Sequence, residues 1–192
     1  MNSENAGAVK TSLVLAFVAL NLTVGGLVSW LKLPVYLDSL GIVMATILLG
    51  WRYGVLCAVL TCFLGFFGRP YLPFYTLTSV AIAVTVELLR RRNLYRNVGT
   101  TIISGLIVAI VAAIFSAPVT AVVFGGVTAS GSDLVTAFFR GTGRSLIQSV
   151  FISGLSSEPV DKTLVALVTF FSLRGLPQRF LTNFSLRGIS DK

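Results

Sequence analysis

The residues that could do chemistry in this chain are few, and most of them are charged or aromatic. The 192 residues include no His, two Cys, seven acids and 15 Lys and Arg. Zinc sites, His-based catalytic triads and haem ligation therefore have almost no side chains to draw on. Because the sequence also pairs no nucleophile with a base, we expect a protein that is not an enzyme and carries no cofactor.

Polar and aromatic side chains suited to solute binding occur in the predicted loops after the first and third apolar runs. Tyr36 and Asp38 follow the first run, and Arg69, Tyr71 and Tyr75 follow the third. Rings with a polar end suit a solute pocket near a membrane surface, although the same residue types form the aromatic belt at a lipid interface. Ionised groups near apolar helices are costly unless paired or functional, which favours Asp38 as a binding residue.

A further group of candidates lies in the polar stretch 125–131, which reads Gly-Gly-Val-Thr-Ala-Ser-Gly. This stretch is too polar to cross lipid, and it offers backbone donors and small hydroxyls, among them Thr128 and Ser130. We expect Thr128 and Ser130 to contact a solute at the outer face of the membrane.

An amphipathic helix is predicted after this stretch, over residues 132–151, with a break at 141–143. Asp133 lies near its start, and its polar positions, spaced four apart, include Arg140 and Arg144. In one interpretation this helix lies at the outer lipid interface with both arginines on lipid phosphates; in the other it lines a polar cavity. The second interpretation adds Asp133, Arg140 and Arg144 to the candidate binding residues.

The elements that position these residues are predicted to be membrane helices. Hydrophobic residues make up 55% of the chain and charged residues only 11%, against about 25% in soluble proteins. We predict an all-α integral membrane protein, a single domain over residues 1–192 with about six transmembrane helices and an additional amphipathic outer segment at 125–157. The expected spans lie near residues 9–31, 37–50, 53–67, 74–89, 98–124 and 159–174. The second and third spans are short, and a re-entrant pair there would leave four crossings.

The basic residues lie in the gaps between apolar runs, which indicates contact with a lipid bilayer and not with nucleic acid. With both termini cytoplasmic, the inner side would carry Lys10, Arg52, Arg90, Arg91, Arg92, Arg96, Arg174, Arg179, Arg187 and Lys192. The outer side would carry Lys32, Arg69, Arg140, Arg144 and Lys162. Since basic loops favour the cytoplasm, this distribution supports a multi-pass protein with both termini inside.

Two predicted helices carry stripes of small residues, which let membrane helices approach closely. The first stripe is Ser12, Ala16, Ala19, Thr23 and Gly26, and the second is Thr101, Gly105, Ala109, Ala112 and Ser116. Either stripe could pack inside this chain or against another protein.

The last helix is expected to begin at Glu158-Pro159, where Pro suits the first turn and the carboxylates of Glu158 and Asp161 would complement the helix dipole. Cys57 and Cys62 lie in one predicted helix, where a disulfide between them is geometrically poor, so both are expected to be buried thiols.

The chain resembles the substrate-binding, or S, components of energy-coupling factor (ECF) transporters over most of its length. The resemblance rests on the small-residue face of the first helix, the stretch 33–41 (Leu-Pro-Val-Tyr-Leu-Asp-Ser-Leu-Gly), the basic fourth loop, Ser116-Ala117-Pro118 leading to Phe124-Gly125-Gly126, and the stretch 158–162 (Glu-Pro-Val-Asp-Lys). It implies a six-helix protein of a prokaryotic cell membrane that captures a vitamin at its outer face. Its partners would be a transmembrane coupling subunit and two ATPase subunits that hydrolyse the ATP.

The resemblance also implies a docking contact and a substrate. The family's coupling contact matches Ser12, Ala16 and Ala19, although this chain has a mixed stripe where the family has strict alanines. The long outer segment and the Phe-Gly-Gly-Val-Thr pattern resemble cobalamin-specific members, and other vitamins or a nucleoside-like solute remain open. The alternative function is a structural or assembly subunit of the membrane, suggested by the small-residue stripes.

Overall fold

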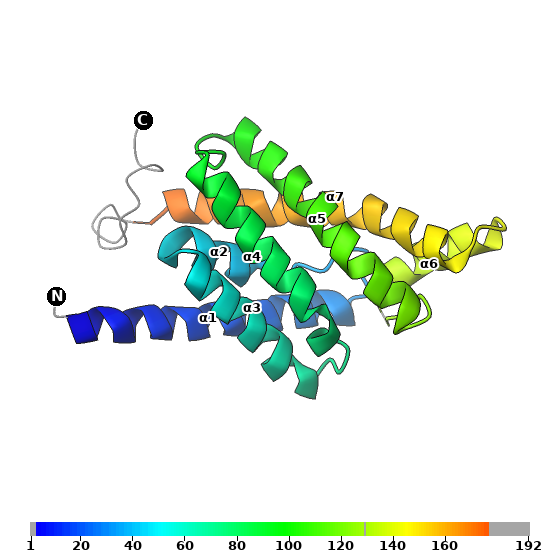
Figure 1. The fold of residues 1–192 in the computed structure, drawn as a ribbon, viewed down its shortest axis with the longest axis horizontal. Coiled ribbons are helices and arrows are strands. Elements are labelled where there is room, and N and C mark those ends of the chain that lie inside the picture. Colours follow the sequence, from blue (N-terminus) through cyan, green and yellow to red (C-terminus); the bar gives the residue numbers. More distant parts are fainter. Residues whose placement is uncertain (1–2, 129, 177–192) are drawn as a thin grey trace.

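The computed structural model describes residues 3–128 and 130–176, and every regular element in these two ranges is helical (Figure 1). The long helices are α1 (Ser3–Trp30), α2 (Leu40–Leu49), α3 (Trp51–Leu64), α4 (Thr76–Arg91), α5 (Val98–Val122), α6 (Ser132–Gly141) and α7 (Leu146–Arg174). Two short 3₁₀ turns, η1 (Gly65–Phe67) and η2 (Leu72–Tyr75), join α3 to α4. The prediction of an all-α fold is confirmed.

Three segments are long and apolar enough to cross a membrane: Gly7–Trp30, Leu72–Arg91 and Val98–Val122. The segments Leu40–Leu49 and Trp51–Phe67 are apolar but shorter. Since a bilayer core about 30 Å thick needs about 20 helical residues, three of the expected spans have the length and composition of a membrane helix.

The small-residue stripe of α5 packs inside this chain, against α7. Thr101, Gly105, Ala109 and Ala112 are all buried. A Cβ atom added at Gly105 would lie 2.6 Å from Cα of Thr163 on α7, so only glycine permits this approach of the two backbones. The α5 stripe is therefore used to build the bundle.

The small-residue stripe of α1 is left open. Ser12, Ala16, Ala19 and Thr23 are exposed, and a Cβ added at Gly26 would meet nothing within 4 Å. Two stripes of the same composition thus have different surroundings in the described chain.

The buried Asn21 joins the first three long helices on the opposite side of α1. Its side-chain amide donates to Thr61 Oγ1 of α3 at 3.1 Å, and its carbonyl oxygen accepts from the backbone N–H of Gly41 of α2 at 2.6 Å. Because a buried amide needs such partners, Asn21 fixes the register of α1 against α2 and α3. Cys57 and Cys62 on α3 are buried free thiols, as predicted.

The break predicted at 141–143 within the amphipathic helix is confirmed, whereas the predicted start of the last helix is wrong. Helix α6 ends at Gly141, and α7 begins at Leu146 with Ser145 and Gln148 as a reciprocal capping box. Helix α7 then continues through Pro159 without ending. Residues 146–157 consequently belong to α7 and not to a separate outer segment.

Buried apolar residues form two clusters. The larger one draws on six helices and includes Val14, Ile42, Val86, Val108 and Val165. The smaller one joins the end of α5 to the start of α7 through Ala117, Ala121 and Val150. Glu158, Asp161 and Lys162 lie on α7 between the residues that α7 gives to the two clusters, and all three are buried.

Candidate functional site: a charged pocket in the helix bundle

A pocket opens between α1, the loop 31–39, the two 3₁₀ turns, α4, α5 and α7, and encloses about 750 Å³ when the space at its open mouth is included. Its wall is polar, charged and aromatic, and includes Gly25, Tyr36, Asp38, Arg69, Tyr71, Tyr75, Thr78, Thr128, Ser130, Glu158 and Lys162.

A buried cluster on α7, made of Glu158, Asp161 and Lys162, forms the charged side of the pocket. Lys162 donates a hydrogen bond to Asp161, and its Nζ lies 3.4 Å from Glu158 Oε2. Glu158 and Lys162 are each 4% exposed, and Asp161 is fully buried. Since buried ions are costly unless paired, the single ammonium of Lys162 is what permits two carboxylates at this depth.

Asp161 also holds the loop between α1 and α2. Its Oδ1 accepts from the backbone N–H of Tyr36 at 2.9 Å and from that of Leu37 at 2.7 Å. Leu37 has φ of +48°, in the left-handed region that non-glycine residues rarely adopt. The two hydrogen bonds therefore stabilise a loop conformation that is unfavourable by itself.

Tyr36 links this loop to α6. Its hydroxyl donates to Ser132 Oγ at 2.8 Å, and its ring lies below Lys162, with Nζ at 5.8 Å from the ring centroid. Burial raises the pKa of the Tyr36 phenol, so the hydroxyl stays protonated at neutral pH and acts as a donor.

Asp38 and Arg69 meet at Gly25 of α1. A Cβ atom added there would lie 2.8 Å from Cβ of Asp38 and 2.9 Å from Nη1 of Arg69. Glycine at this position therefore provides the space in which both charged side chains reach the pocket. The two residues come from different loops, after α1 and after η1 respectively.

Three buried polar atoms of the pocket residues have no hydrogen-bond partner within the described structure: Arg69 Nη2, Thr78 Oγ1 and Glu158 Oε2. Buried polar groups are almost always hydrogen-bonded, and an unpaired one costs about 1–3 kcal/mol. These three atoms belong to residues that line one cavity, where a polar solute or water could pair with them.

An aromatic wall faces these groups. Tyr71 and Tyr75 pack edge to face with ring centroids 6.3 Å apart, and Tyr75 stacks on Phe124 at 6.0 Å. The Tyr75 hydroxyl lies 2.7 Å from Thr120 Oγ1 of α5. These contacts fix the orientation of Tyr75, which can offer a ring face or edge to a flat solute.

The loop before α6 completes the pocket. Asp133 accepts from the backbone N–H of Thr128 at 3.0 Å and from its hydroxyl at 3.1 Å. Ser130 Oγ lies 2.9 Å from Thr128 Oγ1 and 2.7 Å from Ser132 Oγ. Through Ser132 this network reaches the hydroxyl of Tyr36, so side chains join the loop after α1 to the loop before α6.

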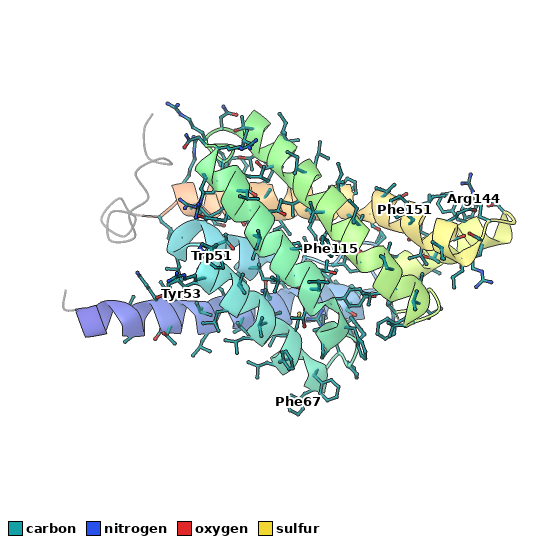
Figure 2. All side chains as sticks on the ribbon, viewed as in Figure 1. Trp51, Tyr53, Phe67, Phe115, Arg144 and Phe151 are labelled. Carbon is teal, nitrogen blue, oxygen red and sulfur yellow. The ribbon has the colours of Figure 1, made fainter. Side chains whose placement is uncertain are left out.

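Of the ten binding residues predicted from the sequence, seven line this one pocket: Tyr36, Asp38, Arg69, Tyr71, Tyr75, Thr128 and Ser130. Asp133 lies behind the wall and acts on Thr128. Arg140 and Arg144 are exposed, and the Arg144 guanidinium lies over the ring of Phe139 at 5.8 Å. Figure 2 shows Arg144 at the opposite end of the molecule from Trp51 and Tyr53. These two arginines do not belong to the pocket.

Sequence reasoning missed the buried cluster on α7, because Glu158 and Asp161 were interpreted as helix caps. The helix passes through Pro159, and both carboxylates face inward. A signal was present: Glu158 and Lys162 are four residues apart, the spacing of a helical ion pair, and a lysine so close to an apolar run indicates a functional site. In the described residues no group of His, Cys, Asp and Glu could hold a metal ion.

No family model matches this chain, and neither a curated protein nor a solved structure matches it. The case for a function therefore rests on the geometry of the pocket.

Proposed function

We propose that this chain is the solute-binding membrane subunit of a transporter of the ECF type, in a prokaryotic cell membrane. The observation that carries the proposal is the pocket itself. It combines buried charges, an aromatic wall and three unpaired polar atoms within an apolar bundle, an arrangement that favours a small solute over lipid.

The proposed membrane placement uses six helices, α1 to α5 and α7, with both termini cytoplasmic. Lys10 lies over the ring of Tyr53, the residue after Arg52, at 5.6 Å, and Arg174 donates to the backbone carbonyl of Arg96 at 3.0 Å. Basic stretches that are distant in the chain therefore lie close together. Lys10 is about four turns of α1, or about 22 Å, from Gly25 of the pocket. A basic end on one side and a solute pocket towards the other agree with a cytoplasmic basic face.

The proposed energy source is a partner module made of a transmembrane coupling subunit and two ATPases. Its support is the open stripe on α1, where Ser12, Ala16 and Ala19 are exposed although the equivalent stripe on α5 is buried. Since lipid does not drive helices together, a smooth exposed face is the type of surface on which another membrane helix packs.

A second candidate function is an assembly subunit that binds another membrane protein and no solute. The open α1 stripe favours it equally. The pocket favours the first candidate, because an assembly subunit has no need of a cavity lined by charged and aromatic side chains.

Uptake and binding measurements test the proposal. Purified chain should bind one solute of a vitamin panel in calorimetry without ATP, and cells should accumulate that solute only when the coupling module is also present. Cobalamin stays the sequence-based prediction and belongs in the panel. Absence of binding across the panel, with unimpaired growth of a deletion strain on scarce vitamins, would favour the assembly subunit.

A further inference from the structure

The charges around the pocket do not balance. Among the residues that line the pocket or form an ion pair with a lining residue, three are carboxylates, Asp38, Glu158 and Asp161, and two are cations, Arg69 and Lys162. One negative charge is therefore in excess in a cavity that is sunk into apolar helices, where an unbalanced charge is expensive.

The ion pairs among these five residues indicate which carboxylates carry the excess negative charge. Lys162 is the partner of both Asp161 and Glu158. Asp38 and Arg69 form no ion pair within the described residues, although both side chains reach Gly25. Glu158 is 4% exposed, and its Oε2 has no hydrogen-bond partner. Glu158 Oε2 thus has an ion-pair contact with Lys162 but accepts no hydrogen bond, and the Asp38 carboxylate has neither an ion pair nor a hydrogen bond among the described residues. Nη2 of Arg69 is the donor that has no acceptor.

We propose that the pocket binds a solute with a positively charged nitrogen that donates to Glu158 and Asp38, and with an acceptor oxygen or ring nitrogen that faces Arg69. The inference rests on the proposed binding function and names the chemical class of its substrate. The charged nitrogen neutralises the excess carboxylate, and the acceptor fills the unpaired Nη2 of Arg69. The hydroxyl of Thr78 adds a donor or acceptor for a neutral polar group.

The same arrangement of charges disfavours two other classes of solute. A solute whose only charge is a carboxylate would bring a fourth negative charge to a site with three, and like charges at short range cost several kcal/mol at an interface. A solute without hydrogen-bonding groups would leave Glu158 Oε2 and Arg69 Nη2 unpaired. Tyr71 and Tyr75 add a preference for a flat ring, which can pack against their own rings. The same rings further stabilise a cation that lies next to them.

The test uses the purified full chain and a charge-graded panel in calorimetry at pH 7. The panel holds pyridoxamine and tryptophan as solutes with a donating ammonium group, biotin, nicotinate and pantothenate as anions, and riboflavin as a neutral flat ring. Any solute that copurifies is extracted, identified by mass spectrometry and assigned to the same three classes. We expect the bound solute to carry a cationic nitrogen.

Glu158→Gln removes the charge and keeps the shape, and should weaken that binding by about 10- to 100-fold, as loss of a charged hydrogen bond does. Asp38→Asn, in a loop, gives an independent measurement should Glu158→Gln fail to fold. The matched control is Glu87→Gln on α4, because Glu87 pairs with Arg90 and Arg91 and does not line the pocket.

Each outcome has a distinct meaning. A cationic or zwitterionic solute whose affinity falls in Glu158→Gln or Asp38→Asn, but not in Glu87→Gln, supports the inference. An anionic or neutral solute, or affinity that is unchanged in both pocket variants, overturns it and leaves the binding function intact. Absence of any bound solute overturns the proposed function as well.

Discussion

The carboxylate of Asp161 accepts a hydrogen bond of 2.9 Å from the backbone N–H of Tyr36, which lies 125 residues earlier in the chain. Through this contact the middle of α7 fixes the loop that follows α1. Lys162, the next residue on α7, lies over the ring of the same tyrosine. The loop conformation and the charged wall of the pocket therefore depend on each other.

Removal of the Asp161 carboxylate should destabilise the protein. Asp161→Ala leaves Glu158 as the only carboxylate next to the Lys162 ammonium, and it leaves the backbone N–H groups of Tyr36 and Leu37 without an acceptor. We therefore expect the free energy of unfolding to fall by about 3–5 kcal/mol. Asp161→Asn keeps an acceptor oxygen and should lose less. Thermal unfolding in detergent measures both variants, and an unchanged melting temperature for Asp161→Ala would show that the carboxylate does not hold the loop.

Filling the space at Gly25 should weaken solute binding. The side chain of Gly25→Val would displace Asp38 and Arg69, and we expect affinity to fall by about tenfold or more, which corresponds to about 1.4 kcal/mol. Gly26→Val is the matched control on the same helix, because a Cβ there meets nothing within 4 Å. Equal losses in the two variants would mean that the effect comes from the helix and not from the pocket.

A bulky side chain on the open stripe of α1 should separate binding from uptake. Ala16→Trp is expected to leave solute affinity unchanged and to reduce uptake by about tenfold or more, since one large clash at the centre of an interface removes much of its binding energy. Ile110→Trp controls for bulk on an exposed helix face, because Ile110 is 53% exposed and lies on α5, away from the α1 stripe. Uptake that survives Ala16→Trp would argue against docking through this face.

Asp133 and Arg144, which the sequence placed on one amphipathic helix, should respond differently to mutation. Asp133→Ala removes the acceptor for the backbone and hydroxyl of Thr128, so we expect weaker solute binding in the same calorimetric assay. Arg144→Ala should have no effect, because Arg144 is exposed, its guanidinium lies over the ring of Phe139, and it does not line the pocket. A large fall in solute affinity in Arg144→Ala would show that the residues just before α7 belong to the binding site.

The sequence was sufficient to predict much of the pocket, for a physical reason. The loops that carry Tyr36, Asp38 and Arg69 follow the first and third apolar runs, which are expected to cross the bundle in the same direction. Both loops therefore lie at the same end of the bundle, where their side chains can meet. The break at 141–143 follows from its two glycines in the same way. By contrast, the different surroundings of the two small-residue stripes could not be predicted, since their composition is alike and only tertiary packing separates them.

The buried cluster of α7 was missed because one local signal was ambiguous. Proline suits the first turn of a helix but also occurs inside longer ones, and Pro159 was assigned to a helix start. The capping box of Ser145 and Gln148 marks the true start. This box has the Ser-x-x-Gln spacing and precedes an apolar run, so it was available in the sequence.

The most direct test of the central claim is native mass spectrometry of the chain purified in detergent without ATP. We predict one equivalent of a small organic solute on the wild-type chain, retained in Gly26→Val and lost in Gly25→Val. A wild-type chain that is empty and stays empty after incubation with each vitamin, or a solute retained equally by both glycine variants, would contradict the account.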